Sequence, residues 1–192
     1  MYYKACKLLG LEKNPSIVFY VILAYRDENS VASVKMFKVA LNLCRAAKYE
    51  KLGLWLLRKM KEFNCRPDIV SYNVVIRLVV EKGELDEAME LMREMGLIDL
   101  YLDMITYISM INGFCDVGRL EDACQLIKCM KGHGCLPNAL VYSTLLDGVC
   151  KHGSLEKALE FLGKMEKEDE DCRPNVVTYS TLIKGFVERV VI

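Results

Sequence analysis

The sequence repeats itself with a period of 35 residues. Tyr72, Tyr107 and Tyr142 stand one period apart. Four further columns hold one residue type across the same three units: Gly83, Gly118 and Gly153; Leu85, Leu120 and Leu155; Ala88, Ala123 and Ala158; Met95, Met130 and Met165. Five such columns are not a chance outcome, so the chain is a tandem array whose units must stack on one another.

The register divides the chain into six segments. We expect an irregular N-terminal helical segment at 1–33, a degenerate repeat at 34–68, complete repeats at 69–103 and 104–138, a repeat with a two-residue insertion at 139–175, and a truncated repeat at 176–192. The insertion falls in the acidic loop 166–171. Polar caps are missing from both ends, and we therefore expect the chain to be a piece of a longer array.

Each unit has the pattern of two helices. In the unit 104–138, residues 105–114 are apolar at helical spacing, and Gly118 is placed to close that helix in the left-handed conformation. A second helix follows with Ala123 on its apolar face, and Pro137 ends it. The predicted fold class is all-α: a right-handed superhelical α-solenoid of helix-turn-helix repeats.

Composition and spacing exclude several kinds of site. The chain balances 26 Lys and Arg against 26 Asp and Glu, which excludes a binder of nucleic acid that works through charge alone. It has no apolar run of 18 residues, so we expect no membrane partner. The nine cysteines contain no Cys-x-x-Cys pair and mostly follow the repeat, which favours packing over metal binding. Neither His133 nor His152 lies near a nucleophile, and we expect no enzyme, metal or cofactor.

Two polar columns remain. Asn73, Ser143 and Ser180 each follow the column Tyr, and Asp68, Asp103, Asn138 and Asn175 each end a unit. Helix N-capping explains the Asp and Asn column adequately. It does not explain a short polar residue that recurs one turn into the helix. We expect Asn73, Ile108, Ser143 and Ser180 to line one concave face, about one repeat apart.

These features resemble the pentatricopeptide repeat. The resemblance rests on the segment 176–186, the Gly-x-Leu-x-x-Ala stretch, the Met of the second helix and the closing Arg-Pro-Asp/Asn, and it covers about 34–192. The 34-residue tetratricopeptide repeat fits less well, and the absence of short and long variants looks like the P class of the family. The resemblance implies an RNA-binding factor that acts in organellar RNA processing, stability, splicing or translation. It implies a mitochondrial location, or alternatively a plastid one.

The resemblance also implies which residues contact RNA. In the family each repeat reads one base through the residue after the Tyr and the last residue of the unit, while the second residue wedges between bases. The implied base-reading residues are Asn73 with Asp103, Ile108 with Asn138, Ser143 with Asn175, and Ser180. The implied wedges are Val70, Ile105, Leu140 and Val177. In the degenerate repeat the same places hold Lys38, Asp68 and Lys35, and Lys38 selects no base but could contact a phosphate.

Hydrogen-bond chemistry assigns bases to these pairs. Asp only accepts, which suits uracil or guanine, whereas Asn also donates, which suits adenine or cytosine. A short Ser leaves room for a purine and a longer Asn favours a pyrimidine. We therefore expect U at Asn73 with Asp103, A at Ser143 with Asn175, a purine at Ser180, and no selection at Ile108.

The expected phosphate contacts are few. Family members often place a basic residue near the end of the first helix, where this chain has Glu81, Asp116 and Lys151. The leading expectation is sequence-selective binding of single-stranded RNA, with protein partners in RNA processing. The rival is a helical scaffold that binds a protein partner in the same groove, and a degenerate product without function is a third alternative.

Overall fold

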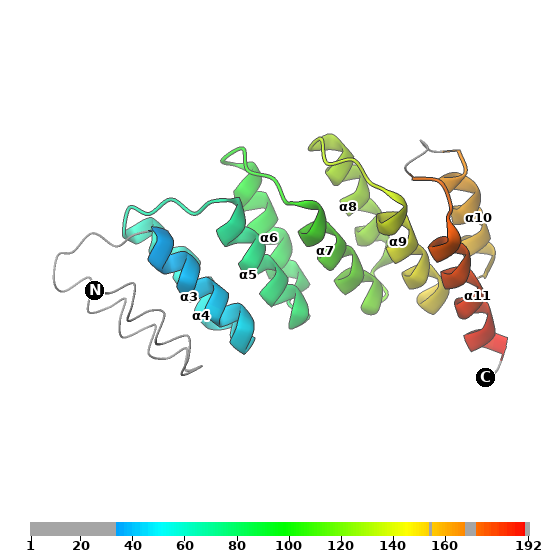
Figure 1. Ribbon diagram of the computed structural model, residues 1–192, viewed down its shortest axis with the longest axis horizontal. Coiled ribbons are helices and arrows are strands. Elements are labelled where there is room, and N and C mark those ends of the chain that lie inside the picture. The colour runs from blue at the N-terminus through cyan, green and yellow to red at the C-terminus, as the bar shows by residue number, and fades with distance from the viewer. Residues whose placement is uncertain (1–33, 154, 168–171, 191–192) are drawn as a thin grey trace. The chain divides into compact units, whose positions relative to one another are not determined.

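The computed structural model describes residues 34–153, 155–167 and 172–190, and the regular elements there are α helices (Figure 1). The predicted N-terminal segment 1–33 lies outside the described residues, as does most of the acidic loop 166–171. The chain divides after Leu102 into two compact units, 1–102 and 103–192.

In its described part, residues 34–102, the first unit has two helix pairs. Its helices are α3 (Val34–Ala47), α4 (Glu50–Glu62), α5 (Ile69–Glu81) and α6 (Leu85–Gly96). Helix α3 packs on α4, and α5 packs on α6. Helix α5 also contacts α3 and α4, so the second pair stacks on the first.

The second unit continues the same arrangement. Its helices are α7 (Met104–Asp116), α8 (Leu120–Gly132), α9 (Ala139–His152), α10 (Leu155–Met165) and α11 (Val176–Val190). Helix α7 packs on α8, and α9 packs on α10. The first helices α7, α9 and α11 form a row in which α9 contacts both others (Figure 1). The predicted fold class, an all-α solenoid of helix pairs, is confirmed.

The repeated residues form the cores of both units. The small-residue column is buried throughout, at Gly53, Ala88, Ala123 and Ala158. The Met column is fully buried as well, at Met60, Met95, Met130 and Met165. Burying a side chain of this size stabilises a fold by about 1.5–3 kcal/mol. A helix pair alone has no partner for its second apolar face, so this stabilisation depends on the neighbouring pair.

The left-handed turn predicted at Gly118 forms, and Gly83 forms the same turn at the end of its helix. Gly83 and Gly118 have φ values of 79° and 75°, a region that glycine occupies without steric cost. Gly153 differs, with φ −94° and ψ −167°. Its N–H donates to Val149 O at 2.7 Å and so continues the helical pattern, and α9 extends to His152. The third glycine of the column therefore does not form the left-handed turn.

Close glycine contacts join the first helices of the second unit. A Cβ atom on Gly148 of α9 would lie 2.4 Å from Cys115 Sγ of α7. A Cβ atom on Gly185 of α11 would lie 2.6 Å from Cys150 Cβ of α9. Favourable contacts between heavy atoms lie near 3.5–4.0 Å, so no larger residue fits either place without movement. Burial raises the pKa of the Cys115 thiol to about 12, which keeps it protonated at neutral pH and suits a packing role.

The glycine contacts yield a stability prediction. We expect Gly148→Ala to lower the free energy of unfolding by about 1–3 kcal/mol, because its methyl group overpacks the contact with Cys115. Gly163→Ala in α10 is the matched control, since no atom lies within 4 Å of its Cβ position. Alanine is the better helix former by about 0.5–1 kcal/mol, so the control should be neutral or stabilising. Urea unfolding of both variants measures the difference.

A second substitution tests the cause. Cys115 Cβ itself lies 2.5 Å from the added methyl position, so Cys115→Gly should recover part of the loss in the Gly148→Ala background. Equal effects of the two glycine substitutions would show that the α7–α9 contact does not exclude a methyl group.

Candidate nucleic-acid interface

The Asp or Asn that ends each repeat caps the first helix of the next repeat. The distances from side-chain Oδ1 to backbone N are 3.0 Å for Asp68 and Ser71, 2.8 Å for Asp103 and Thr106, 3.2 Å for Asn138 and Val141, and 3.2 Å for Asn175 and Thr178. A cap of this kind stabilises a helix by about 1 kcal/mol. The capping explanation of this column is confirmed.

The cap also determines which atom of the closing side chain is left for a ligand. A backbone N–H only donates, so the capped atom of Asn138 and Asn175 is the amide oxygen. Their Nδ2 groups remain outside the cap as donors. In Asp103 the cap uses Oδ1, and Oδ2 remains outside it as an acceptor. Capping and base recognition thus use different atoms of one side chain and are compatible.

The residues after the column Tyr lie deeper than predicted. Asn73 and Ser143 are 2% and 4% exposed, Ile108 is half-buried, and Ser180 is exposed. The prediction that all four display on one concave face is wrong for Asn73 and Ser143. The reason is clearest at Ser143, because α11 packs on α9 there and the hydroxyl groups of Ser143 and Thr178 share a hydrogen bond. Asn73 Oδ1 is buried without a hydrogen-bond partner among the described residues.

The structure brings some of the predicted pairs together. Ser143 Oγ lies 2.9 Å from Thr178 Oγ1, which lies 3.3 Å from Asn175 Oδ1. In the degenerate repeat, Lys38 Nζ contacts Asp68 Oδ2 directly at 2.5 Å.

The other two pairs show no such link. Ile108 has no polar atom in its side chain to join Asn138, although α7 and α9 pack together. Asn73 belongs to the first unit and Asp103 to the second.

The predicted wedge residues are exposed. Val70, Ile105, Leu140 and Val177 are 53%, 62%, 54% and 55% exposed, and each is the second residue of a first helix. In the second unit the last three lie on the packed helices α7, α9 and α11. Large apolar side chains that recur in this way on a surface mark a contact with a ligand or partner more often than isolated ones do.

Ion pairs occupy the lysines that were candidates for phosphate contacts. Lys151 Nζ lies 2.6 Å from Asp147 Oδ2 and 3.8 Å from Asp116 Oδ1. Its hydrogen bond to Asp147 raises the pKa of Lys151. Lys38, which the sequence offered as a phosphate contact, pairs with Asp68. The interface therefore has little unpaired positive charge at these positions for an RNA backbone.

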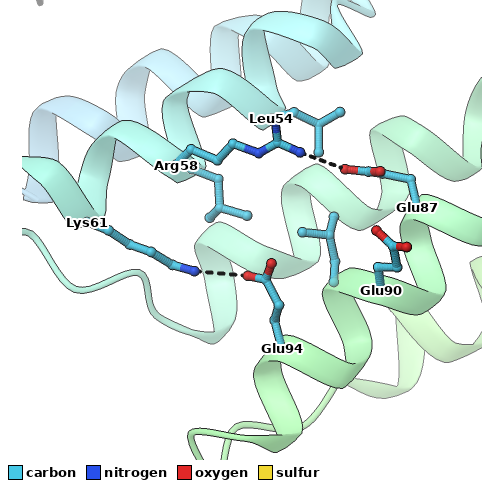
Figure 2. Close-up of a pocket in the computed structure, with 8 residues that line it drawn as sticks. Leu54, Arg58, Lys61, Glu87, Glu90 and Glu94 are labelled. Atoms are coloured by element: carbon cyan, nitrogen blue, oxygen red, sulfur yellow. Dashed lines mark hydrogen bonds and ion pairs between the residues drawn. The ribbon is translucent and has the colours of Figure 1, made fainter.

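A charged pocket between α4 and α6 was not indicated by the sequence (Figure 2). Arg58 Nη2 lies 3.3 Å from Glu87 Oε1, and Lys61 Nζ lies 2.9 Å from Glu94 Oε2. Glu90 faces the same pocket. Its volume of about 40 Å³ is far below the several hundred Å³ of a ligand pocket, so it does not accommodate a nucleobase.

The described residues show neither a metal-binding group nor a membrane span. No three His, Cys, Asp or Glu side chains among them are grouped to hold a metal ion. Among the same residues, no helix combines the length and the apolar character that crossing a bilayer requires.

Sequence analysis missed Thr178. This residue is fully buried and contacts both Ser143 and Asn175. The signal was present, because the third residue of the first helix is Ser71, Thr106, Val141 or Thr178, which are small or β-branched throughout. Such residues also occur in helices without a functional role, so this column by itself does not indicate a site.

Family models match most of the chain. Residues 67–115, 102–151 and 140–188 match the PPR repeat family, and residues 26–82 match the pentatricopeptide repeat domain. A pentatricopeptide repeat-containing protein of Arabidopsis thaliana is 47% identical over 88 residues, which are 46% of this chain and 18% of that protein. The chain therefore spans less than a fifth of this relative.

Solved structures share the fold. The crystal structure of PPR10 from maize is 26% identical with a TM-score of 0.70, over 91% of this chain and 26% of that one. PPR10 in complex with an 18-nt psaJ RNA element gives 24% identity and a TM-score of 0.68, over 96% and 27%. The PPR domain of Arabidopsis thaliana protein-only RNase P 1, in complex with tRNA, gives 15% identity and a TM-score of 0.75, over 97% of both chains. The last two matches show the fold alone.

Asp68 gives the first unit a pH-dependent stability. Burial raises the pKa of its carboxyl, but hydrogen bonds from Lys38 and Ser71 outweigh burial, so the folded-state pKa lies below the usual value. Such a carboxyl contributes stability that is present above its unfolded pKa of about 3.9 and is lost as the pH falls through the folded pKa. We expect Asp68→Asn, which keeps the capping oxygen, to lower the free energy of unfolding at pH 7 by about 0.3–1 kcal/mol.

Urea unfolding at pH 7 and at pH 3 measures this contribution. The difference between wild type and Asp68→Asn should shrink at pH 3, where the carboxyl is becoming protonated. Asp99→Asn, at an exposed carboxyl of the same unit, is the control and should show no such change. A deficit of equal size at both pH values would mean that the ion pair with Lys38 adds nothing.

Proposed function

This chain belongs to the pentatricopeptide repeat family, and we propose that it binds single-stranded RNA selectively and catalyses no reaction on it. The observation that carries the proposal is that the exposed wedge residues lie beside the closing Asp and Asn residues that cap the same helices. Ile105, Leu140 and Val177 offer apolar surface on successive helices, and each stands two residues after a capping Asp or Asn. That geometry suits bases stacked between side chains, with a polar atom at each base edge.

The proposed base assignment follows the atoms that the caps leave outside. Asn175 Nδ2 lies outside the cap as a donor, which suits the ring nitrogen of adenine, and the short Ser143 leaves room for a purine. Asp103 Oδ2 lies outside the cap as an acceptor, which suits the ring N–H of uracil. Asn73 is longer than Ser143 and favours a pyrimidine at this place.

The chain is thus proposed to select a short motif. With Ile108 selecting nothing and Ser180 selecting a purine, the motif is 5′-U-N-A-(A/G)-3′ for a chain that runs parallel to the RNA. The repeats concerned are 69–103, 104–138, 139–175 and the start of 176–192. Base recognition of this kind is worth about 1–3 kcal/mol per nucleotide, so two or three selective repeats give micromolar affinity or weaker.

The cellular role we propose is organellar RNA processing, stability, splicing or translation. The support is membership of the family, in which such roles are typical, and the location that fits is the mitochondrion or alternatively the plastid. The chain spans only about a quarter of PPR10, so further repeats and protein partners in a longer protein would add affinity and specificity.

A titration with labelled single-stranded RNA separates RNA binding from the rival protein scaffold. We expect binding of a 5′-UNAA-3′ oligonucleotide at low salt, with a log–log salt slope of roughly −1 to −2. Each neutralised phosphate contributes about −0.7 to that slope, and the ion pairs of Lys38 and Lys151 keep the number small. Double-stranded RNA of the same sequence is the control. No binding to any single strand at low salt would favour the scaffold.

A base switch tests the proposed code. We expect Asn175→Asp to change the preferred third base from A to G, because it keeps the cap and replaces the Nδ2 donor with an acceptor. In a longer array that binds tightly, the switch should amount to about 1–3 kcal/mol, like a single-base mismatch. Competition binding with the four bases at that position measures it.

The matched control is Asn138→Asp. It makes the same exchange at another capped helix, but its partner Ile108 forms no hydrogen bond, so base preference at the second position should stay flat. If Asn175→Asp still prefers A, or loses affinity for A and for G equally, the closing residue acts only as a helix cap.

A further inference from the structure

Thr178 joins the two proposed base-reading residues of the preceding repeat. Its Oγ1 lies 2.9 Å from Ser143 Oγ in α9 and 3.3 Å from Asn175 Oδ1 at the start of α11. It also accepts from the backbone N–H of Asn175 at 3.2 Å. Thr178 and Ser143 are 0% and 4% exposed, so these bonds form in a site with little access to water. One buried hydroxyl group therefore contacts both members of the pair.

The direction of these hydrogen bonds follows from the number of protons. Each hydroxyl group has one proton, and the amide oxygen of Asn175 can only accept. If Thr178 donates to Asn175 and Ser143 donates to Thr178, both protons have an acceptor. The opposite direction would leave the buried Ser143 proton without one, which costs free energy. Ser143 therefore offers only lone pairs to a ligand, while the Asn175 amide oxygen faces the cap.

The other junctions match polarity in the same two columns. A junction is defined here as the residue after the column Tyr of one repeat and the third residue of the next. Ser143 faces Thr178, and both are polar, whereas the equivalent pair Ile108 and Val141 is apolar at both places. In the degenerate repeat the pair is Lys38 and Ser71, which both bond to the closing carboxylate of Asp68. The pair Asn73 and Thr106 is polar as well, but Asn73 Oδ1 and Thr106 Oγ1 are each buried without a hydrogen-bond partner among the described residues.

We propose that the third residue of a repeat is a positioning residue for base selection by the preceding repeat. In this chain Thr178 would orient Ser143 as an acceptor and hold the Asn175 amide with its donor outward, and so favour adenine over guanine. The inference rests on the proposed RNA-binding function. It adds Thr178 to the pair of Ser143 and Asn175 and places this third residue in the following repeat.

The inference explains why Ile108 and Val141 occur together. Val141, the residue equivalent to Thr178 at this junction, is fully buried and its side chain cannot accept a hydroxyl proton from a polar residue at 108. Restoring selection at the second base of the motif should therefore need both positions. Ile108→Ser with Val141→Thr would recreate the contact of Ser143 with Thr178, beside the existing Asn138 cap.

The first experiment removes the hydroxyl group. Thr178→Val keeps the shape and frees the Ser143 proton to donate, which guanine O6 accepts. Competition binding by the full chain, with RNA oligonucleotides that differ only at the third base, should show the preference for A over G fall by about 3- to 10-fold, as for one lost hydrogen bond. Thr178→Ser should restore it. Thr144→Val is the matched control, because Thr144 Oγ1 donates to Leu140 O within its own helix.

The second experiment builds the contact. Ile108→Ser alone and the double variant with Val141→Thr are compared for selection at the second base. We expect a preference for A of about 3- to 10-fold in the double variant and less than half of it in the single one. A gain of selectivity does not arise from a fold that is merely damaged. Circular dichroism of each variant confirms that it is helical before RNA is added.

The outcomes separate this inference from the proposed function. If wild type selects A at the third base but Thr178→Val keeps the same ratio of A to G, the third residue does not position the pair and RNA binding stands. The same conclusion follows if Ile108→Ser alone gains the full preference. If wild type binds no RNA or shows no preference at the third base, the proposed function is wrong and the inference fails with it.

Discussion

Successive first helices in the second unit approach so closely that a methyl group does not fit between them. Cys115 on Gly148 and Cys150 on Gly185 set this distance for α7–α9 and α9–α11. The same approach brings Ser143 within hydrogen-bond reach of Thr178 in the next helix. A wider spacing would leave room for water there, and the hydrogen-bond direction of Ser143 would no longer be determined by the protein. Gly148 and Gly185 therefore determine the helix spacing in the proposed interface as well as in the core.

Much of the helical arrangement could be predicted from the sequence, because the repeated Asp, Asn and Gly residues have conformational preferences that mark where helices begin and end. Asp and Asn before a helix cap it, and Gly83 and Gly118 end helices in the left-handed region, as their positions indicate. The depth of Asn73 and Ser143 could not be predicted, because a 35-residue period says nothing about how close neighbouring helices lie. The different conformation of Gly153 could not be predicted for a related reason: membership of the glycine column does not determine where the last hydrogen bond of α9 falls.

Interactions between repeats escaped the sequence for a different reason. The ion pair of Lys151 with Asp116 joins α9 to α7 across one period. The contact of Ser143 with Thr178 joins α9 to α11 across the next period. Pairing between columns has no signature within a single repeat. Lys151, the cation that the sequence offered to phosphate, is paired with Asp147 in its own helix and with Asp116 one period earlier, so apolar stacking is the main source of the proposed affinity. Binding that depends on apolar contact is less sensitive to salt than binding through phosphates.

In each closing Asp or Asn, one side-chain atom caps the helix and the other is proposed to contact the base. This separation has a consequence for how such arrays evolve. Asp and Asn codons differ by one transition at the first base, and both side chains cap a helix equally well. Under the proposed code, a single-nucleotide mutation at the codon for Asn175 or Asp103 would therefore alter the target sequence at little cost to folding. Ser143, enclosed by α11, has less freedom. An array built in this way can drift toward new transcripts one letter at a time, while the packing that keeps it folded stays under selection.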